Sequence, residues 1–197
     1  MRGTIDDFKT YESYQKLTGE NYDEGSPSLL ADNAGRQFFL CPISNPKGWT
    51  KEERLLIAEH HADFAKQWRL PVRVAVYTGV RHETYDRKKN IRRGVTGHLN
   101  QTYEDAEWIV AELKKRKVKA KNWAIDFNPA AAAGYTIHIP VNGLVGNQMF
   151  RMLLLNGGKI LIATRFGLSH FYEDNSRTEK DFDFHIKWLV ARINEKR

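Results

Sequence analysis

Apolar and polar residues alternate in blocks along this chain, and the blocks predict strands and helices in turn. Short apolar runs bounded by glycine or proline predict strands at 36–43, 72–77, 123–127, 135–141 and 159–164. Apolar residues at helical spacing predict a short helix at 4–17 and four main helices at 51–68, 102–117, 143–155 and 177–193. This alternation favours an α/β fold: one layered domain with a mixed β-sheet of about five or six strands flanked by about four helices.

Local signals sharpen two of these predictions. Thr50 and Glu53 have the spacing of a capping box, in which the Thr50 hydroxyl accepts from the Glu53 amide and the Glu53 side chain reaches back. The buried stripe of this helix is then Ile57, His61, Phe64 and Trp68. Farther along, we expect the strands at 123–127 and 135–141 to form a hairpin.

The composition predicts one soluble domain with an acidic leader. Residues 1–35 carry 3 Lys/Arg against 7 Asp/Glu and several glycines, and we expect an N-terminal appendage followed by a single α/β domain over 36–197. Cys41 is the only cysteine, which excludes an internal disulfide and a multi-cysteine zinc site. The longest apolar run has four residues and the N-terminus lacks the apolar centre of a secretory signal. We therefore expect no membrane contact and an intracellular, cytoplasmic location.

Positive charge is concentrated in the middle of the chain. Residues 81–121 carry 12 Lys/Arg against 6 Asp/Glu, a net +6 of the overall +7. A concentrated positive field attracts polyanions such as a phosphate backbone. Nucleic acid, DNA or RNA, or another polyanion is therefore the leading predicted partner. The alternatives are a solvated loop, a loop folded against the acidic leader, and a non-catalytic adaptor or assembly subunit that binds an acidic protein.

The residues predicted to hold a phosphate backbone lie in a loop and at a helix end. Arginine forks match phosphate geometry and tyrosine stacks on bases. The loop residues are Arg81, Tyr85, Arg87, Lys88, Lys89, Arg92 and Arg93, and those of the helix end are Lys114, Lys115 and Lys117.

Three carboxylates are candidates for catalysis. Asp126 stands at the end of an apolar run, where an acid is costly to bury unless it is paired or binds a metal. With Asp174 and Asp183 it would hold Mg²⁺ for phosphodiester hydrolysis, with Asp126 as the metal ligand. The arrangement resembles that of ribonuclease-H-like nucleases, although the helix at 143–155 contains no acid. The alternative role of Asp126 is to cap the turn before Pro129.

A glycine-containing turn between a strand and a helix supports a different function. The unit from Tyr135 to Arg165 resembles the Rossmann fingerprint of nucleotide-dependent dehydrogenases and epimerases. Gly143 and Gly146 match its last two glycines, and Pro140 stands where the first belongs. The resemblance implies a nucleotide- or phosphate-ligand enzyme with Gly143 and Gly146 at the ligand. Otherwise these glycines only permit close packing.

Overall fold

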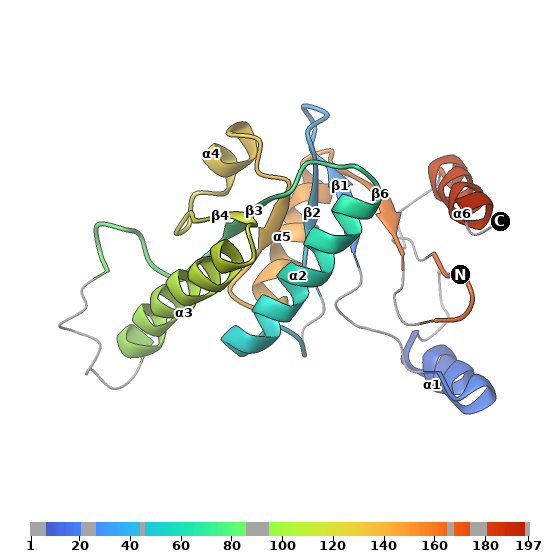
Figure 1. Cartoon of the computed structure of the whole chain (residues 1–197), viewed down its shortest axis with the longest axis horizontal. Helices are drawn as coiled ribbons and strands as arrows, with labels where there is room; N and C mark the ends of the chain where they lie inside the picture. Colours follow the sequence, from blue (N-terminus) through green and yellow to red (C-terminus); the bar gives the residue numbers. More distant parts are fainter. Residues whose placement is uncertain are drawn as a thin grey trace.

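In the computed structural model, the described residues are 7–20, 27–43, 46–85, 95–164, 168–173 and 181–195. They form a six-stranded mixed sheet with helices on both faces, which confirms the predicted α/β fold (Figure 1). The strands are β1 (Ser28–Ala31), β2 (Gln37–Leu40), β3 (Arg73–Val76), β4 (Lys119–Asn122), β5 (Ile137–Ile139) and β6 (Lys159–Ala163). The helices are α1 (Asp7–Thr18), α2 (Lys51–Gln67), α3 (Val95–Lys115), α4 (Phe127–Ala132), α5 (Gly143–Leu155) and α6 (Asp183–Glu195).

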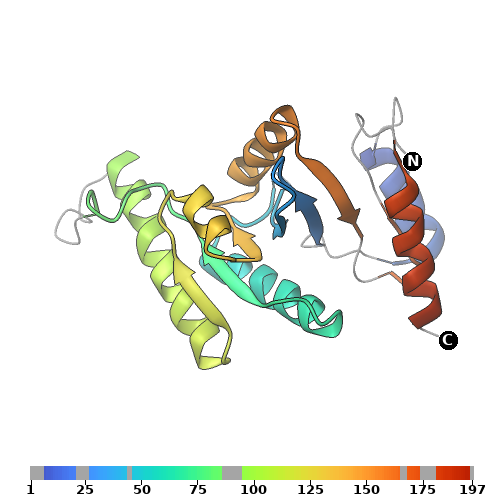
Figure 2. The same cartoon turned by 90° about the horizontal axis from the view of Figure 1, so that it is seen from above.

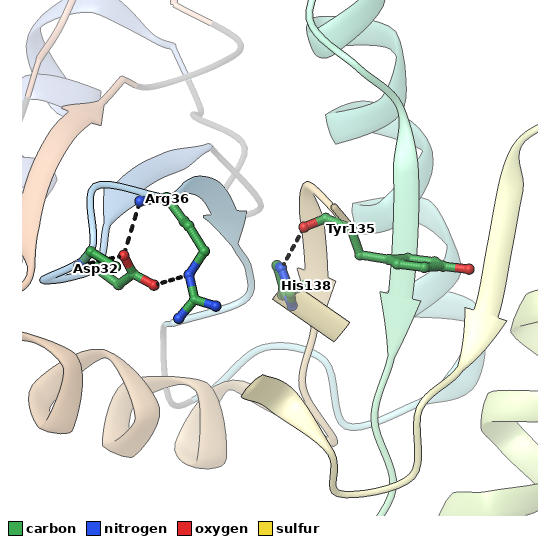
Figure 3. A network of polar contacts seen from close by, with 5 residues as sticks. Asp32, Arg36, Tyr135 and His138 are labelled. Carbon is green, nitrogen blue, oxygen red and sulfur yellow. Dashed lines mark hydrogen bonds and ion pairs between the residues drawn. The ribbon is translucent and has the colours of Figure 1, made fainter. Parts of the chain in front are cut away.

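The sheet has the strand order β4-β3-β5-β2-β1-β6. Its four strands β4, β3, β5 and β2 are parallel, whereas β1 pairs antiparallel with both β2 and β6. β1 lies within the first 35 residues, and the predicted division at residue 35 falls in the turn that joins β1 to β2. There Asp32 accepts hydrogen bonds from the Ala34 and Arg36 amides and pairs with the Arg36 guanidinium at 2.6 Å (Figure 3).

Two helical layers enclose the sheet. On one face, α2 and α3 bury Ile57, Phe64 and Ile109 against β3 and β5. On the other face, Phe150 of α5 packs on Leu30, Phe38 and Leu40, and α4 covers β3. At the β6 end, Trp188 of α6 packs against Trp68 with the rings tilted by 54° and their centroids 4.4 Å apart.

The predicted start of α2 is confirmed. The Glu53 amide donates to the Thr50 hydroxyl at 3.1 Å, and the Glu53 carboxylate accepts from the Trp49 amide at 3.1 Å. The predicted hairpin is wrong, because β4 and β5 are parallel and β3 lies between them. Residues 123–126 form a turn, with Ala124 at φ +50°, between β4, which lies just before them, and α4, which begins at Phe127.

None of the helices in the described ranges combines the length and apolarity needed to cross a membrane.

Candidate functional site

The chain reverses its winding direction at the centre of the sheet. β2 and β5 are parallel neighbours, but the segment after β2 leads to α2 on one face, whereas the segment after β5 leads to α5 on the other. In open α/β sheets, ligands bind outside the carboxyl ends of strands at such a switch point. We call the edge at which β2, β3, β4 and β5 end the carboxyl edge. The topology places the candidate site there, between the starts of α2 and α5.

Arg54 supplies a buried positive charge at this edge. It lies in the first turn of α2, is only 2% exposed, and donates from Nη2 to the Tyr77 carbonyl at the end of β3 at 2.7 Å. Among the described residues, its buried Nε atom has no hydrogen-bond partner and no carboxylate forms an ion pair with the guanidinium. Burial lowers the pKa of Arg54 to about 10, and the charge of Asp105 opposes that shift.

A buried guanidinium with one carbonyl partner among the described residues is energetically costly. The pKa of Arg54 is lowered to about 10, mainly by burial, which corresponds to a net cost of about 3 kcal/mol for keeping the guanidinium charged. Buried charges in proteins are normally paired or hydrogen-bonded throughout. An anion at the carboxyl edge would supply the missing counter-charge, and the fork of Arg54 matches the oxygens of a phosphate.

The loop between β2 and α2 covers Arg54 and reaches the start of α5. The position that a Cβ of Gly48 would take lies 3.6 Å from Arg54 Cγ and 2.6 Å from Pro42 Cγ. The neighbouring Lys47 carbonyl accepts from the Gly143 amide at 2.7 Å. A loop carbonyl therefore occupies the first amide of α5, where an anion oxygen would otherwise be favoured.

The two predicted glycines have different surroundings. Gly143 opens α5, and the Asn142 side chain caps the helix by accepting from the Val145 amide at 2.9 Å. Gly146 is a packing position, because a Cβ there would lie 1.9 Å from the Pro42 carbonyl oxygen. Gly146 thus lets α5 approach the end of β2, and only Gly143 presents its amide at the site.

The structure separates two of the predicted catalytic acids. Asp126 follows β4 and is exposed, and its side chain makes no capping hydrogen bond to α4. Asp183 pairs with Lys187 at 3.1 Å on α6, which packs on β6 at the opposite end of the sheet. Asp174 lies outside the described residues. Within the described ranges no three His, Cys, Asp or Glu side chains form a group that would hold a metal, so Asp126 and Asp183 do not fit a shared Mg²⁺.

The predicted basic residues are only partly described, since Arg87, Lys88, Lys89, Arg92 and Arg93 lie outside the described ranges. Arg81 is exposed, and Tyr85 stacks on Tyr103 with ring centroids 4.0 Å apart. At the end of α3, Lys115 pairs with Glu112 at 2.5 Å, and Lys114 and Lys117 are exposed.

A buried histidine lies below the carboxyl edge. His138 on β5 contacts the Tyr135 carbonyl through Nε2 at 2.9 Å (Figure 3) and the Tyr77 hydroxyl through Nδ1 at 2.5 Å. Because a carbonyl only accepts, Nε2 carries the hydrogen and Nδ1 accepts from Tyr77. Burial lowers the pKa of His138 to about 4. Burial, and then the charge of Asp126, raise the pKa of Tyr77, so both groups are neutral at pH 7.

Because the pKa of His138 is lowered, we expect the folded protein to lose stability in acid. The unfolded chain binds a proton at His138 below about pH 6.5, whereas the folded chain does so only near pH 4. The unfolded state therefore binds more protons in this window, and the free energy of unfolding should fall by about 3 kcal/mol as the pH drops from 6.5 to 4. Urea unfolding across this range measures the fall, and NMR titration of the imidazole identifies its source. An imidazole that titrates near pH 6.5 in the folded protein would contradict this assignment.

Comparison with known proteins adds a relative and two structural neighbours. No protein-family model matches the chain. It is 27% identical over 156 residues to a Methanosarcina barkeri (strain Fusaro / DSM 804) protein named as methyltransferase mtx subunit X. That match covers 79% of this chain and 54% of the relative, so the chain spans about half the length of that protein.

The two structural neighbours are named as a phosphotransacylase and a phosphotransacetylase. A branched-chain phosphotransacylase from Enterococcus faecalis V583 superposes with a TM-score of 0.60 and 16% identity, over 96% of this chain and 71% of that one. The EutD phosphotransacetylase from Staphylococcus aureus gives a TM-score of 0.56 and 13% identity, over 86% of this chain and 53% of that one. At these identities the likeness shows a shared fold.

These neighbours overturn the leading functional prediction. The chain was expected to be a nucleic-acid-binding protein with possible nuclease activity, and that prediction is wrong because the shared fold is that of phosphotransacylases. The alternative, a phosphate-ligand enzyme, agrees better with them. Charge density along the sequence was misleading, since Lys119 and Lys121 lie on the edge strand β4, where lysines commonly prevent edge-to-edge pairing.

Sequence reasoning missed Arg54, although a signal was present. Arg54 stands three residues before Ile57 and seven before His61, on the buried stripe of α2. A charged residue on an otherwise apolar stripe marks either a structural ion pair or a ligand site.

Proposed function

We propose that the chain binds a phosphate-bearing small molecule at the carboxyl edge and belongs to an enzyme that transfers acyl groups to or from phosphate. The buried Arg54 guanidinium, which lacks a carboxylate partner among the described residues, is the observation that carries this proposal. The fold shared with two phosphotransacylases supports the reaction class.

The roles of the site residues follow from their positions. Arg54 neutralises the phosphate and fixes its orientation through two donors. The Gly143 amide, at the positive end of α5, binds a second oxygen once the Lys47 carbonyl moves away. Phosphate binding is therefore coupled to displacement of the loop 46–50, because this loop covers Arg54 in the structure.

Acetyl phosphate and inorganic phosphate are the probes that test this proposal. At constant ionic strength and pH 7.5, each should raise the melting temperature of the protein, whereas equivalent chloride should not. A ligand at 100 times its Kd adds about 2.7 kcal/mol to the free energy of unfolding. No shift with either phosphate compound at 50 mM would contradict binding at this site.

The curated relative favours a second candidate function. Its name describes a subunit of a methyltransferase, and this name supports a role for the chain as a component of a methyltransferase assembly. A protein of that kind would show no phosphate-dependent stabilisation, so the same titration distinguishes the two functions.

A further inference from the structure

Helix α6 is attached to the sheet through little buried surface. Figure 2 shows it at the outer end of the sheet, beyond β6 and far from α3. Of its thirteen residues, all of them described, only His185 is buried, whereas α2 buries eight of its seventeen residues. Hydrophobic stabilisation is roughly proportional to the apolar area removed from water, so α6 gains much less from docking than α2 does.

The outward side of α6 is more apolar than the side that meets the sheet. Four apolar side chains of the helix are exposed to between 41% and 57%: Phe184, Ile186, Val190 and Ile193. The side toward the sheet instead presents His185, Trp188 and Arg192, which contact Glu173, Trp68 and Thr164. A helix that is packed stably on a core normally turns its apolar side inward.

The polar contacts beneath α6 leave buried atoms without partners. Glu173 Oε1 accepts from the Ala163 amide at 2.5 Å and lies 2.8 Å from His185 Nδ1. Among the described residues, Glu173 Oε2, His185 Nε2 and Trp188 Nε1 are buried with no hydrogen-bond partner. Such atoms have lost their hydrogen bonds to water, which weakens docking. Burial also raises the pKa of Glu173, so its ionised carboxylate is more stable in water than in this position.

The core of the domain does not depend on α6. Trp188 packs against Trp68, with ring centroids 4.4 Å apart, and against Phe64, with centroids 6.0 Å apart. Phe64 also packs on Phe39 of β2, and the other buried apolar residues of α2 pack with α3, β3 and β5. These contacts remain when α6 is removed, so the two layers beside the central strands keep their packing.

From this mismatch we infer that α6 is a releasable cover, which leaves the sheet while α2, α3 and the central strands stay folded. The inference is independent of the proposed function. Release returns the unpartnered atoms of Glu173, His185 and Trp188 to water and exposes more of the Trp68 ring. The β6 end of the protein therefore has two states, one with Trp68 covered and one with it open.

Hydrogen exchange at pH 7.5, followed by mass spectrometry, tests the inference on the wild-type protein. A helix of thirteen residues is marginal by itself in water, so the amides of α6 lose protection when it leaves the sheet. We expect them to exchange about 100-fold faster than those of α2 after correction for intrinsic rates. Up to about 2 M urea should hardly change the exchange of α6, because release exposes little surface, but should accelerate that of α2 steeply. Equal urea dependence in the two helices would overturn the inference, since α6 would then open only with the whole protein.

Two variants separate release of α6 from global unfolding. Trp188→Ala removes the packing on Trp68 and should accelerate exchange in α6 about 10-fold or more, although alanine has the higher helix propensity. Ile109→Val, in the fully buried core of α3, should accelerate exchange in α2 by about 3- to 10-fold and leave α6 unchanged. Parallel acceleration of both helices by Ile109→Val, or no acceleration of α6 by Trp188→Ala, would overturn the inference. The urea comparison on the wild type decides the matter even if Trp188→Ala fails to fold.

Discussion

Replacing Arg54 by methionine should abolish stabilisation by phosphate while leaving the unliganded protein folded. The change removes a buried charge whose desolvation costs about 3 kcal/mol. It also leaves the Tyr77 carbonyl without its guanidinium donor, which costs about 1–3 kcal/mol. These effects nearly cancel, so we expect the free energy of unfolding without ligand to stay within about 2 kcal/mol of wild type.

Urea unfolding with and without 50 mM phosphate measures both parts of this prediction. Arg116→Met is the matched control, because Arg116 pairs with Glu59 at 2.6 Å on the surface and is far more exposed than Arg54. The control should keep the full phosphate effect. If Arg54→Met retained the phosphate effect, Arg54 would not be the anion ligand.

Substitution of Gly146 by alanine should be strongly destabilising. A Cβ at this position would lie 1.9 Å from the Pro42 carbonyl oxygen and 2.9 Å from Pro140 Cγ. The first of these atoms belongs to the backbone, so α5 must move away from the end of β2 and lose the packing of Phe150. We expect a loss of about 4 kcal/mol or more in the free energy of unfolding, which is at the upper end for single substitutions.

Gly79→Ala is the control for Gly146→Ala. The nearest atom to a Cβ at Gly79 is Leu99 Cδ2 at 2.6 Å, the end of a flexible side chain that can rotate. Its cost should stay below about 1.5 kcal/mol. Equal losses at the two positions would show that contact with the Pro42 backbone is not what makes Gly146 necessary.

Much of the fold was predictable because buried strands and capped helices leave local signals. The capping box at Thr50 and the apolar runs of β2, β3, β5 and β6 led to the correct class of fold. β4 was misplaced because it lies at the edge of the sheet, where exposed Lys119 and Lys121 interrupt the apolar pattern. The parallel relation of β4 and β5 was missed because strand order depends on long-range pairing.

The site was less predictable, since it depends on which residues the fold brings together. Gly143 was identified from its position between a strand and a helix, and its amide does lie at the carboxyl edge. Arg54 was overlooked because one charge within a helix resembles a surface residue until its burial is known. The concentration of positive charge at 114–121 favoured the prediction of a nucleic-acid surface. In the structure Lys115 and Arg116 pair with Glu112 and Glu59, and Lys119 and Lys121 lie on the edge strand β4.

Locating a bound anion is the most direct test of the central claim. Crystals of the protein soaked in tungstate, an electron-dense phosphate analogue, would show its position by anomalous scattering. We expect a peak within hydrogen-bond distance of the Arg54 guanidinium, beside the start of α5, with the loop 46–50 displaced. A peak only beside Lys114, Lys115 and Lys117 at the end of α3, or no peak at saturating tungstate, would contradict a phosphate site at the carboxyl edge.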